Sequence, residues 1–250
     1  MTAVGQVRGH NEDTALVLTA EQDGDSRFPS FGLFILADGM GGHQAGEIAS
    51  SLAARTAAYY ITRQSYLPSL LSRQHDASQP ALTEVLIDAV QAANGAVSEE
   101  VPGSGTTLIC AVMLDSQAYI AHVGDSRAYV LTDDGLQQIT QDHSVVHRLI
   151  DLGQITPAEA AVHPQRNVLY RAVGQSSTLE VDTYVQKLRP GESLLLCSDG
   201  LWGSVDEAQM SDLIKGAPSV QRACVDLVAA ANEAGGRDNI TVILWRSPVE

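Results

Sequence analysis

The sequence has little cysteine and no long apolar run. Its 250 residues include three cysteines. An odd count without a CxxC pair indicates reduced thiols and argues against a disulfide framework or a zinc site. No stretch approaches the ~18 consecutive apolar residues of a membrane-spanning helix, and the N-terminus lacks the apolar segment of a signal peptide. These absences predict a cytoplasmic protein without a membrane partner.

Positive charge is scarce as well. Fifteen Lys and Arg residues stand against 30 Asp and Glu, which gives a net charge of −15, and only two of the cations are lysines, Lys187 and Lys215. A net anion is repelled by nucleic acid and by anionic lipid. The composition therefore argues against nucleic acid as a partner, while a hydrophobic content of 44% is typical of a globular chain.

The hydrophobic pattern alternates pairs of helices with blocks of short strands. Strands are predicted over 14–19, 31–37, 106–114, 118–123, 128–132, 136–139, 181–185, 193–197 and 240–245, and helices over 47–62, 81–100, 206–214 and 220–233. A loop is expected over the polar residues 64–80, and the glycine-rich residues 38–42 should end the second strand. Tight turns between successive strands indicate antiparallel pairing, so helices layered outside antiparallel sheets are expected.

Five aspartates stand where apolar strands begin or end: Asp13, Asp38, Asp125, Asp199 and Asp238. A carboxylate at the end of an apolar strand lies near low dielectric, where it is costly unless it is paired with a cation. Several such oxygen ligands at one end of a sheet stack would suit Mg²⁺ or Mn²⁺. Each aspartate alone is also an ordinary turn residue, so only their joint occurrence argues for a metal site.

A series of short motifs runs along nearly the whole chain: residues 8–13 (RGHNED), 37–43 (ADGMGGH), 105–107 (GTT), 124–127 (GDSR), 142–144 (DHS), 198–202 (SDGLW) and 236–241 (GRDNIT). In this order the motifs resemble those of the bacterial branch of the PP2C-type (PPM) metal-dependent Ser/Thr protein phosphatases. The resemblance implies an α+β fold, a four-layer αββα sandwich with two central antiparallel β-sheets flanked by helices. It also implies a single domain over 1–250, with a flap subdomain at about 143–180.

The resemblance implies a metal-binding role for several of these residues. Asp38 would bridge two metal ions, Mg²⁺ or Mn²⁺, and the Gly39 carbonyl would bind one of them. Asp199 and Asp238 would be ligands of the other ion. The family mechanism is direct attack of a metal-bridging hydroxide on the phosphorus of phosphoserine or phosphothreonine.

Four further positions take roles from the same resemblance. Asp13 and Glu12 would act at the metal site largely through bound water, and Asp125, with Asp199, would hold a third, weaker ion. Arg8 would hold the substrate phosphate in a fork of two hydrogen bonds. The implied partners are phosphorylated protein substrates, targets of a cognate Ser/Thr kinase, and a monomer is expected.

One position departs from the eukaryotic relatives, in which a histidine after the Asp-Gly pair is the proposed general acid. Here that position is Met40, and His43, three residues further on, is the nearest replacement. A general acid typically contributes about 10²- to 10⁴-fold to such a reaction. His43 is therefore either the catalytic acid or a residue that caps or packs at the following helix.

Two other functions stay open at this stage. A catalytically silent phosphate-sensing or partner-binding module could share the fold, although such proteins usually lose metal acids and all five aspartates are present here. A hydrolase of small phosphate esters, or a stress-response phosphatase acting on a regulatory protein, would differ in substrate and not in site chemistry. His143, His147 and His163 are expected to be solvated or hydrogen-bonded rather than metal ligands.

Overall fold

The computed structural model describes residues 1–20, 30–41, 45–71 and 80–248. Its strands are β1 (Thr2–Ala3), β2 (Asp13–Ala20), β3 (Phe31–Met40), β4 (Gly105–Thr106), β5 (Leu108–Leu114), β6 (Gln117–Val123), β7 (Arg127–Thr132), β8 (Gly135–Gln138), β9 (Asp182–Lys187), β10 (Ser193–Cys197) and β11 (Ile240–Arg246). The helices are α1 (Ala45–Ile61), the π-helical turn η1 (Thr62–Tyr66), α2 (Leu67–Leu71), α3 (Leu82–Glu100), α4 (Val145–Asp151), α5 (Pro157–Ala161), α6 (Asp199–Trp202), α7 (Glu207–Gly216) and α8 (Val220–Glu233).

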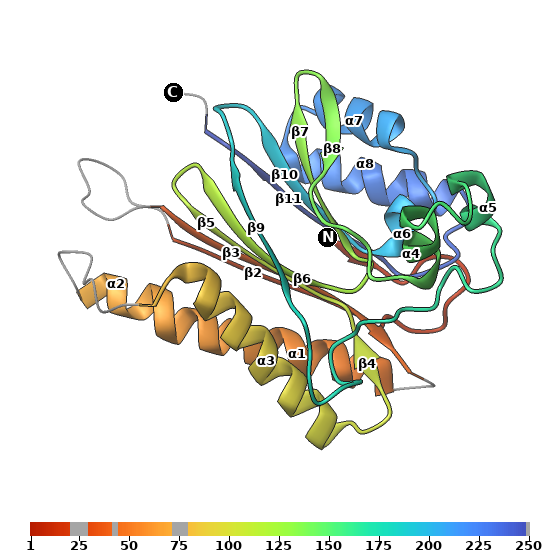
Figure 1. Ribbon diagram of the computed structural model, residues 1–250. Helices are drawn as coiled ribbons and strands as arrows, with labels where there is room; N and C mark the ends of the chain where they lie inside the picture. The colour runs from red at the N-terminus through yellow and green to blue at the C-terminus, as the bar shows by residue number, and fades with distance from the viewer. Residues whose placement is uncertain (21–29, 42–44, 72–79, 249–250) are drawn as a thin grey trace.

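Two antiparallel sheets stack face to face, and helices cover the outer face of each (Figure 1). One sheet has the order β1-β11-β10-β7-β8 and lies under α7 and α8. The other has the order β2-β3-β5-β6-β9, with β4 beside β3, and lies under α1 and α3. This arrangement confirms the predicted four-layer αββα sandwich.

Strand β3 shows why the sheets occupy the middle of the molecule. Successive side chains of a strand point to opposite faces. Leu33 and Ile35 pack in the core beneath α1 and α3, while Phe34 and Leu36 pack in the core between the two sheets. All four side chains are buried, as expected for a strand that is apolar on both faces.

The sequence predicted that the glycine-rich residues 38–42 end the second strand, but the strand does not end at Asp38. Strand β3 continues through Gly39 and Met40, which pair with β4. A Cβ atom at Gly39 would lie 2.1 Å from the carbonyl oxygen of Gly46 in α1. Because glycine has no side chain, the end of β3 can lie in contact with α1. The pairing with β4 therefore continues β3 where a turn was predicted.

The loop predicted over 64–80 is wrong for its first part. Helix α1 continues through η1 into α2, up to Leu71. The hydroxyl groups of Ser65 and Ser69 donate to the carbonyl groups of Ile61 and Tyr66, so these polar side chains are accommodated within the helix. Residues 72–79 lie outside the described residues.

The predicted strand 106–114 is divided into β4 and β5 at Thr107, whose backbone N–H donates to the Asp38 carbonyl.

The segment between β8 and β9 leaves the sheets and carries α4 and α5 (Figure 1). All three cysteines are free. In the described part of the chain, no helix has the length and apolar character needed to cross a membrane.

Candidate active site

Acidic residues from both sheets come to the same end of the sandwich. Asp13 begins β2, Asp38 lies near the end of β3, and Asp125 lies in the turn between β6 and β7. Asp199 follows β10 and begins α6, while Asp238 lies just before β11. The β-ladder places Asp13 directly opposite Asp38. The strand ends noted in the sequence therefore meet in space.

A pocket of about 220 Å³ lies at this end. It is lined by most of the predicted site residues, namely Arg8, Glu12, Asp38, Gly39, Asp125, Asp199 and Asp238, together with Met40, Gly41, Thr107, Asn167, Leu169 and Asn239. Asp13 is absent from the lining and is buried next to Asp38. Among the described residues, Arg8 is the only cation in the lining. His43 lies outside the described residues.

Enclosure in the protein changes the acidity of these carboxyl groups. Burial raises the pKa of Asp13 to about 6 and that of Asp125 to about 7. Burial, with the neighbouring carboxylates, also raises the pKa values of Asp38 and Asp199 well above the usual range for aspartate. Negative charges enclosed together disfavour one another. The set therefore cannot be fully ionised at neutral pH unless cations join it.

Two carboxylate oxygens in this set have no partner. Oδ1 of Asp13 and Oδ1 of Asp199 are buried without a hydrogen bond, whereas Oδ2 of Asp13 accepts one from the Ser198 hydroxyl at 2.8 Å. Leaving a buried acceptor unsatisfied costs about 1–3 kcal/mol. Oxygen donors of this kind suit a hard divalent cation, so the residues present fit a metal site.

The carboxylates do not form a closed cage on their own. Within the described ranges, no group of three or more His, Cys, Asp and Glu side chains is arranged to hold an ion by itself. An ion at this pocket could also use the backbone carbonyl of Gly39 and water as ligands, since Mg²⁺ usually keeps several waters.

Arg8, the lining cation among the described residues, is held by an acid of the set. Nη2 of Arg8 donates to Oδ2 of Asp238 at 2.7 Å, and the Arg8 side chain is 48% exposed. A guanidinium group has five N–H donors. Arg8 therefore retains donors that can bind a phosphate oxygen while Asp238 orients it.

Sequence reasoning assigned no role to three residues that support the acids. Asn239 accepts a hydrogen bond from the Glu12 backbone and donates to the carbonyl groups of Val4 and His10. The Thr107 hydroxyl accepts from the Asp38 backbone N–H at 3.0 Å. Ser198 binds Asp13. Asn239 follows the predicted ligand Asp238, and Ser198 precedes the predicted ligand Asp199. This adjacency is the one sequence feature that could have identified them as supporting residues.

The flap also reaches the pocket. Asn167 and Leu169 belong to the segment between α5 and β9 and line the pocket. Neither residue belongs to one of the sequence motifs, so the sequence did not predict that they line the pocket. His143 is buried and hydrogen-bonded, as predicted, and its contacts are described below.

Comparison with known proteins identifies the family. Residues 23–240 match the protein phosphatase 2C family. The serine/threonine phosphatase stp of Listeria innocua is 39% identical over 242 residues, which cover 96% of this chain and 91% of that protein.

Solved structures agree with this match. A serine/threonine phosphatase of S. agalactiae superposes with a TM-score of 0.83 at 30% identity, covering 98% of this chain and 97% of that one. The catalytic domain of the phosphatase PstP, in complex with two manganese ions, superposes with a TM-score of 0.77 at 32% identity, covering 98% and 94%. The sequence match over most of the chain and the shared sandwich place this chain in the protein phosphatase 2C family.

Proposed function

We propose that the protein is a metal-dependent phosphoprotein phosphatase that hydrolyses phosphoserine and phosphothreonine. The observation that carries the proposal is the pocket of enclosed carboxylates beside Arg8, where Asp199 in the lining and the neighbouring Asp13 each have an unpartnered buried oxygen. A pocket of this kind binds cations and, through them and Arg8, a phosphate. The relatives named as serine/threonine phosphatases support the choice of substrate class.

Each acid has a distinct place in the proposed metal site. Asp38 would be the central ligand, because it lies among Asp13, Asp199, Asp125 and Asp238; burial and these neighbouring charges raise the pKa of its carboxyl. Asp199 and Asp238 would be ligands of one ion, and the Gly39 carbonyl would be a ligand of the other. The two manganese ions of the PstP structure support a pair of divalent ions, Mg²⁺ or Mn²⁺.

The remaining acids complete the proposed arrangement. Glu12 and Asp13 would act largely through bound water, in keeping with the burial of Asp13 opposite Asp38. Asp125, with Asp199, would hold a third and weaker ion.

When bound, such ions would lower the pKa of a coordinated water toward neutrality and would so supply the nucleophile for direct attack on phosphorus. Arg8 binds the non-bridging oxygens of the phosphate through its free N–H donors, and Asp238 keeps its guanidinium in place. Thr107 fixes the backbone of Asp38 through its hydroxyl group. No side chain has to form a covalent intermediate with the phosphoryl group.

His43 is proposed as the acid that protonates the leaving serine or threonine oxygen. His43→Ala should then slow hydrolysis of a phosphothreonine peptide about a hundredfold and leave hydrolysis of p-nitrophenyl phosphate nearly unchanged, because that leaving group needs no proton. Equal slowing of both substrates would exclude the role. The matched control is His163→Ala, a histidine of the flap.

The chain as a whole is proposed to form one phosphatase domain over 1–250, with the flap at about 143–180 as one wall of its pocket. Asn167 and Leu169 in the lining support this role of the flap. The expected substrates are proteins phosphorylated by a Ser/Thr kinase, and the expected site of action is the cytoplasm, with the protein as a monomer.

The test is phosphate release from a phosphothreonine peptide with Mn²⁺, with EDTA, and with Asp38→Ala in Mn²⁺. Activity is expected only in the first condition. The matched control is Asp212→Ala, which removes an exposed acid of α7 and should leave the activity unchanged.

Three other results would contradict the proposal in different ways. Activity that persists in EDTA would exclude metal dependence. Hydrolysis of small phosphate esters without hydrolysis of any phosphopeptide would indicate the small-ester hydrolase. No activity from folded protein that still binds Mn²⁺ would indicate a silent binding module.

A further inference from the structure

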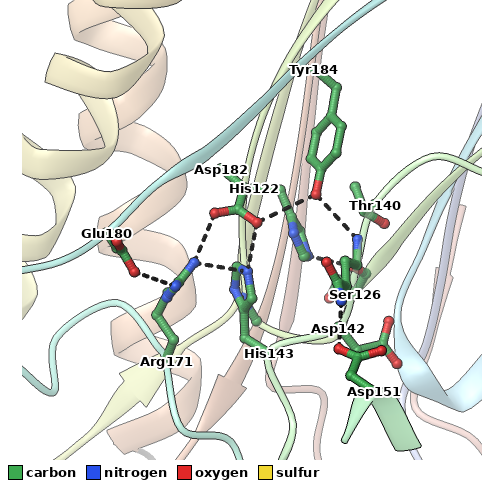
Figure 2. Close-up of polar contacts among 12 residues, drawn as sticks. His122, Ser126, Thr140, Asp142, His143, Asp151, Arg171, Glu180, Asp182 and Tyr184 are labelled. Carbon is green, nitrogen blue, oxygen red and sulfur yellow. Dashed lines mark hydrogen bonds and ion pairs between the residues drawn. The ribbon is translucent and has the colours of Figure 1, made fainter. Parts of the chain in front are cut away.

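A second polar cluster lies next to the pocket and contains none of the proposed metal ligands. It is centred on His143, at the start of the flap, and includes Asp182 of β9, Arg171 of the flap and His122 of β6 (Figure 2). The His143 residue is only 1% exposed. The cluster has contacts with two walls of the pocket.

The first wall is the turn that carries Asp125. The Gly124 N–H donates to Nδ1 of His143 at 3.0 Å, and the His143 N–H donates to the Gly124 carbonyl at 2.8 Å. Gly124 has φ +110°, and a Cβ there would lie 2.6 Å from the Thr107 side chain. The backbone at Gly124 is therefore in close contact with Thr107 and hydrogen-bonded to the imidazole of His143. Asp125 is the next residue, so these contacts also determine its position.

The second wall is the flap segment that carries Asn167 and Leu169. The His143 carbonyl accepts from the Tyr170 N–H at 3.0 Å, and an isolated β-bridge joins Ser144 to Leu169. Leu169 is thus paired with Ser144, and the next residue, Tyr170, is hydrogen-bonded to His143. Leu169 in turn lines the pocket together with Asp125.

The far side of the imidazole is anchored to β9. Nε2 of His143 lies 3.1 Å from Oδ2 of Asp182 and 3.0 Å from Nη1 of Arg171. The same Nη1 donates to Oδ1 of Asp182 at 2.8 Å. Since Nδ1 accepts from Gly124, a neutral ring carries its proton on Nε2 and donates it to Asp182. Burial lowers the pKa of His143, which favours this neutral form.

We propose that His143 is a positioning residue that holds the Asp125 turn and the flap wall of the pocket in one fixed arrangement. Its Nδ1 orients the turn through Gly124, and its Nε2 ties the flap wall to β9 through Asp182. The inference rests on the proposed function for its effect on catalysis, whereas the contacts themselves can be tested in the metal-free protein.

Two conservative substitutions separate the two bonds. His143→Asn keeps an acceptor near the position of Nδ1 and loses the reach to Asp182. His143→Gln keeps a donor near the position of Nε2 and loses the acceptor for Gly124. Asp182→Asn weakens the anchor without touching the ring. The matched control is His147→Asn, a partly exposed histidine in α4 that is part of neither wall.

The first measurement is hydrogen–deuterium exchange of the Gly124 amide in EDTA, together with ¹⁵N NMR of the histidine rings. The wild-type ring of His143 should show a protonated Nε2 and an unprotonated Nδ1. In His143→Gln the Gly124 amide should exchange about fivefold faster, the effect of one lost hydrogen bond. In His143→Asn, Asp182→Asn and the control it should exchange as in the wild type.

The second measurement compares kinetics on a phosphothreonine peptide and on p-nitrophenyl phosphate with Mn²⁺. His143→Gln should lower kcat about fivefold on both substrates, because the Asp125 turn loses its hydrogen bond. His143→Asn and Asp182→Asn should raise KM about fivefold for the peptide alone, because only the flap wall loses its anchor.

The inference is overturned if His143→Gln leaves Gly124 exchange unchanged, or if the Asn and Gln variants raise exchange equally across the whole chain, which would show a packing role only. A proton on Nδ1 would also overturn it. If the wild-type enzyme releases no phosphate, the proposed function fails, while the exchange and NMR results still decide the role of His143.

Discussion

The two ends of the β-sandwich differ in whether their charged side chains are enclosed in the protein or exposed to solvent. At one end, the pocket beside Asp38 encloses carboxylates and has a volume of about 220 Å³. At the other end of the same strands, a larger pocket of about 730 Å³ is lined by Lys187, Arg189, Lys215 and Arg246 together with the acids Asp133, Asp134 and Glu192. Strand β10 joins the two ends, since Ser193 at its start lines the larger pocket and Asp199, two residues after its last residue Cys197, lines the smaller one.

The smaller pocket, where the metal site is proposed, differs from the larger one by its enclosure of unpaired charge and not by a greater volume. Among the described residues, the three buried side-chain atoms without a hydrogen-bond partner are Oδ1 of Asp13, Oδ1 of Asp199 and Nδ1 of His122. The first two lie at the smaller pocket, and His122 lies at the same end, next to the Asp125 turn. The charged residues of the larger pocket are mostly exposed, so water satisfies them.

The largest effect is expected from removing one charge at the smaller pocket. Asp199→Asn should lower phosphate release from a phosphothreonine peptide in Mn²⁺ about a thousandfold, because a side chain proposed to hold the catalytic ions loses its charge. Steady-state kinetics with saturating Mn²⁺ checks this. A loss below tenfold would show that the enclosed acid is not part of the reaction.

The next effect is on stability, and it has a defined sign with pH. Asp13 has a pKa of about 6 in the folded protein, above the 3.8 of an unburied aspartate. The folded state therefore binds the proton more tightly, and this contribution to stability is lost as pH rises from about 4 to about 6. In EDTA, Asp13→Asn should be about 2 kcal/mol more stable than the wild type at pH 7 and equal to it near pH 4.

Urea unfolding in EDTA at both pH values measures this difference. Mn²⁺ at pH 7 should reverse the order, because bound cations stabilise the ionised wild-type carboxylate. An Asn variant that is less stable than the metal-free wild type at pH 7 would contradict the assigned cost of burying this charge.

A smaller effect is expected from a residue that only supports the acids. The Thr107 hydroxyl accepts from the Asp38 N–H and lies 2.7 Å from the Ser126 hydroxyl. Thr107→Val keeps the shape and removes both bonds, so it should destabilise the protein by about 1–3 kcal/mol and lower kcat severalfold. Thermal unfolding and kinetics of the same variant check the two parts; unchanged values in both would show that the hydroxyl group has no supporting role.

The smallest effect is expected at the other end. The double substitution of Lys187→Gln and Lys215→Gln removes both lysines of the chain, and neither lysine is buried. Exposed substitutions usually change stability by less than about 0.5 kcal/mol, and activity on the phosphopeptide should stay within about twofold. A large loss of activity would remove the contrast between the two ends.

Much of the site could be predicted because its residues interrupt apolar strands. Asp38 and Asp199 stand out in sequence against the buried runs that precede them, and glycines follow both. The same reasoning failed for the extent of β3, because Gly39 and Met40 pair with a two-residue strand, β4, that has no pattern of its own. Asn167 and Leu169 could not be found either, since a flap residue enters the pocket only through tertiary contacts.

The sequence by itself determined the layers, because apolar alternation and small residues decide which faces are buried, and it determined which acids stand at strand ends. Only the tertiary structure decided that acids far apart in the chain share one enclosed pocket, since that depends on which strands become neighbours. It also decided that His143 lies between the Asp125 turn and Asp182. Hydrogen bonds between segments 19 and 39 residues apart form only when the fold brings them together, and no local pattern encodes them.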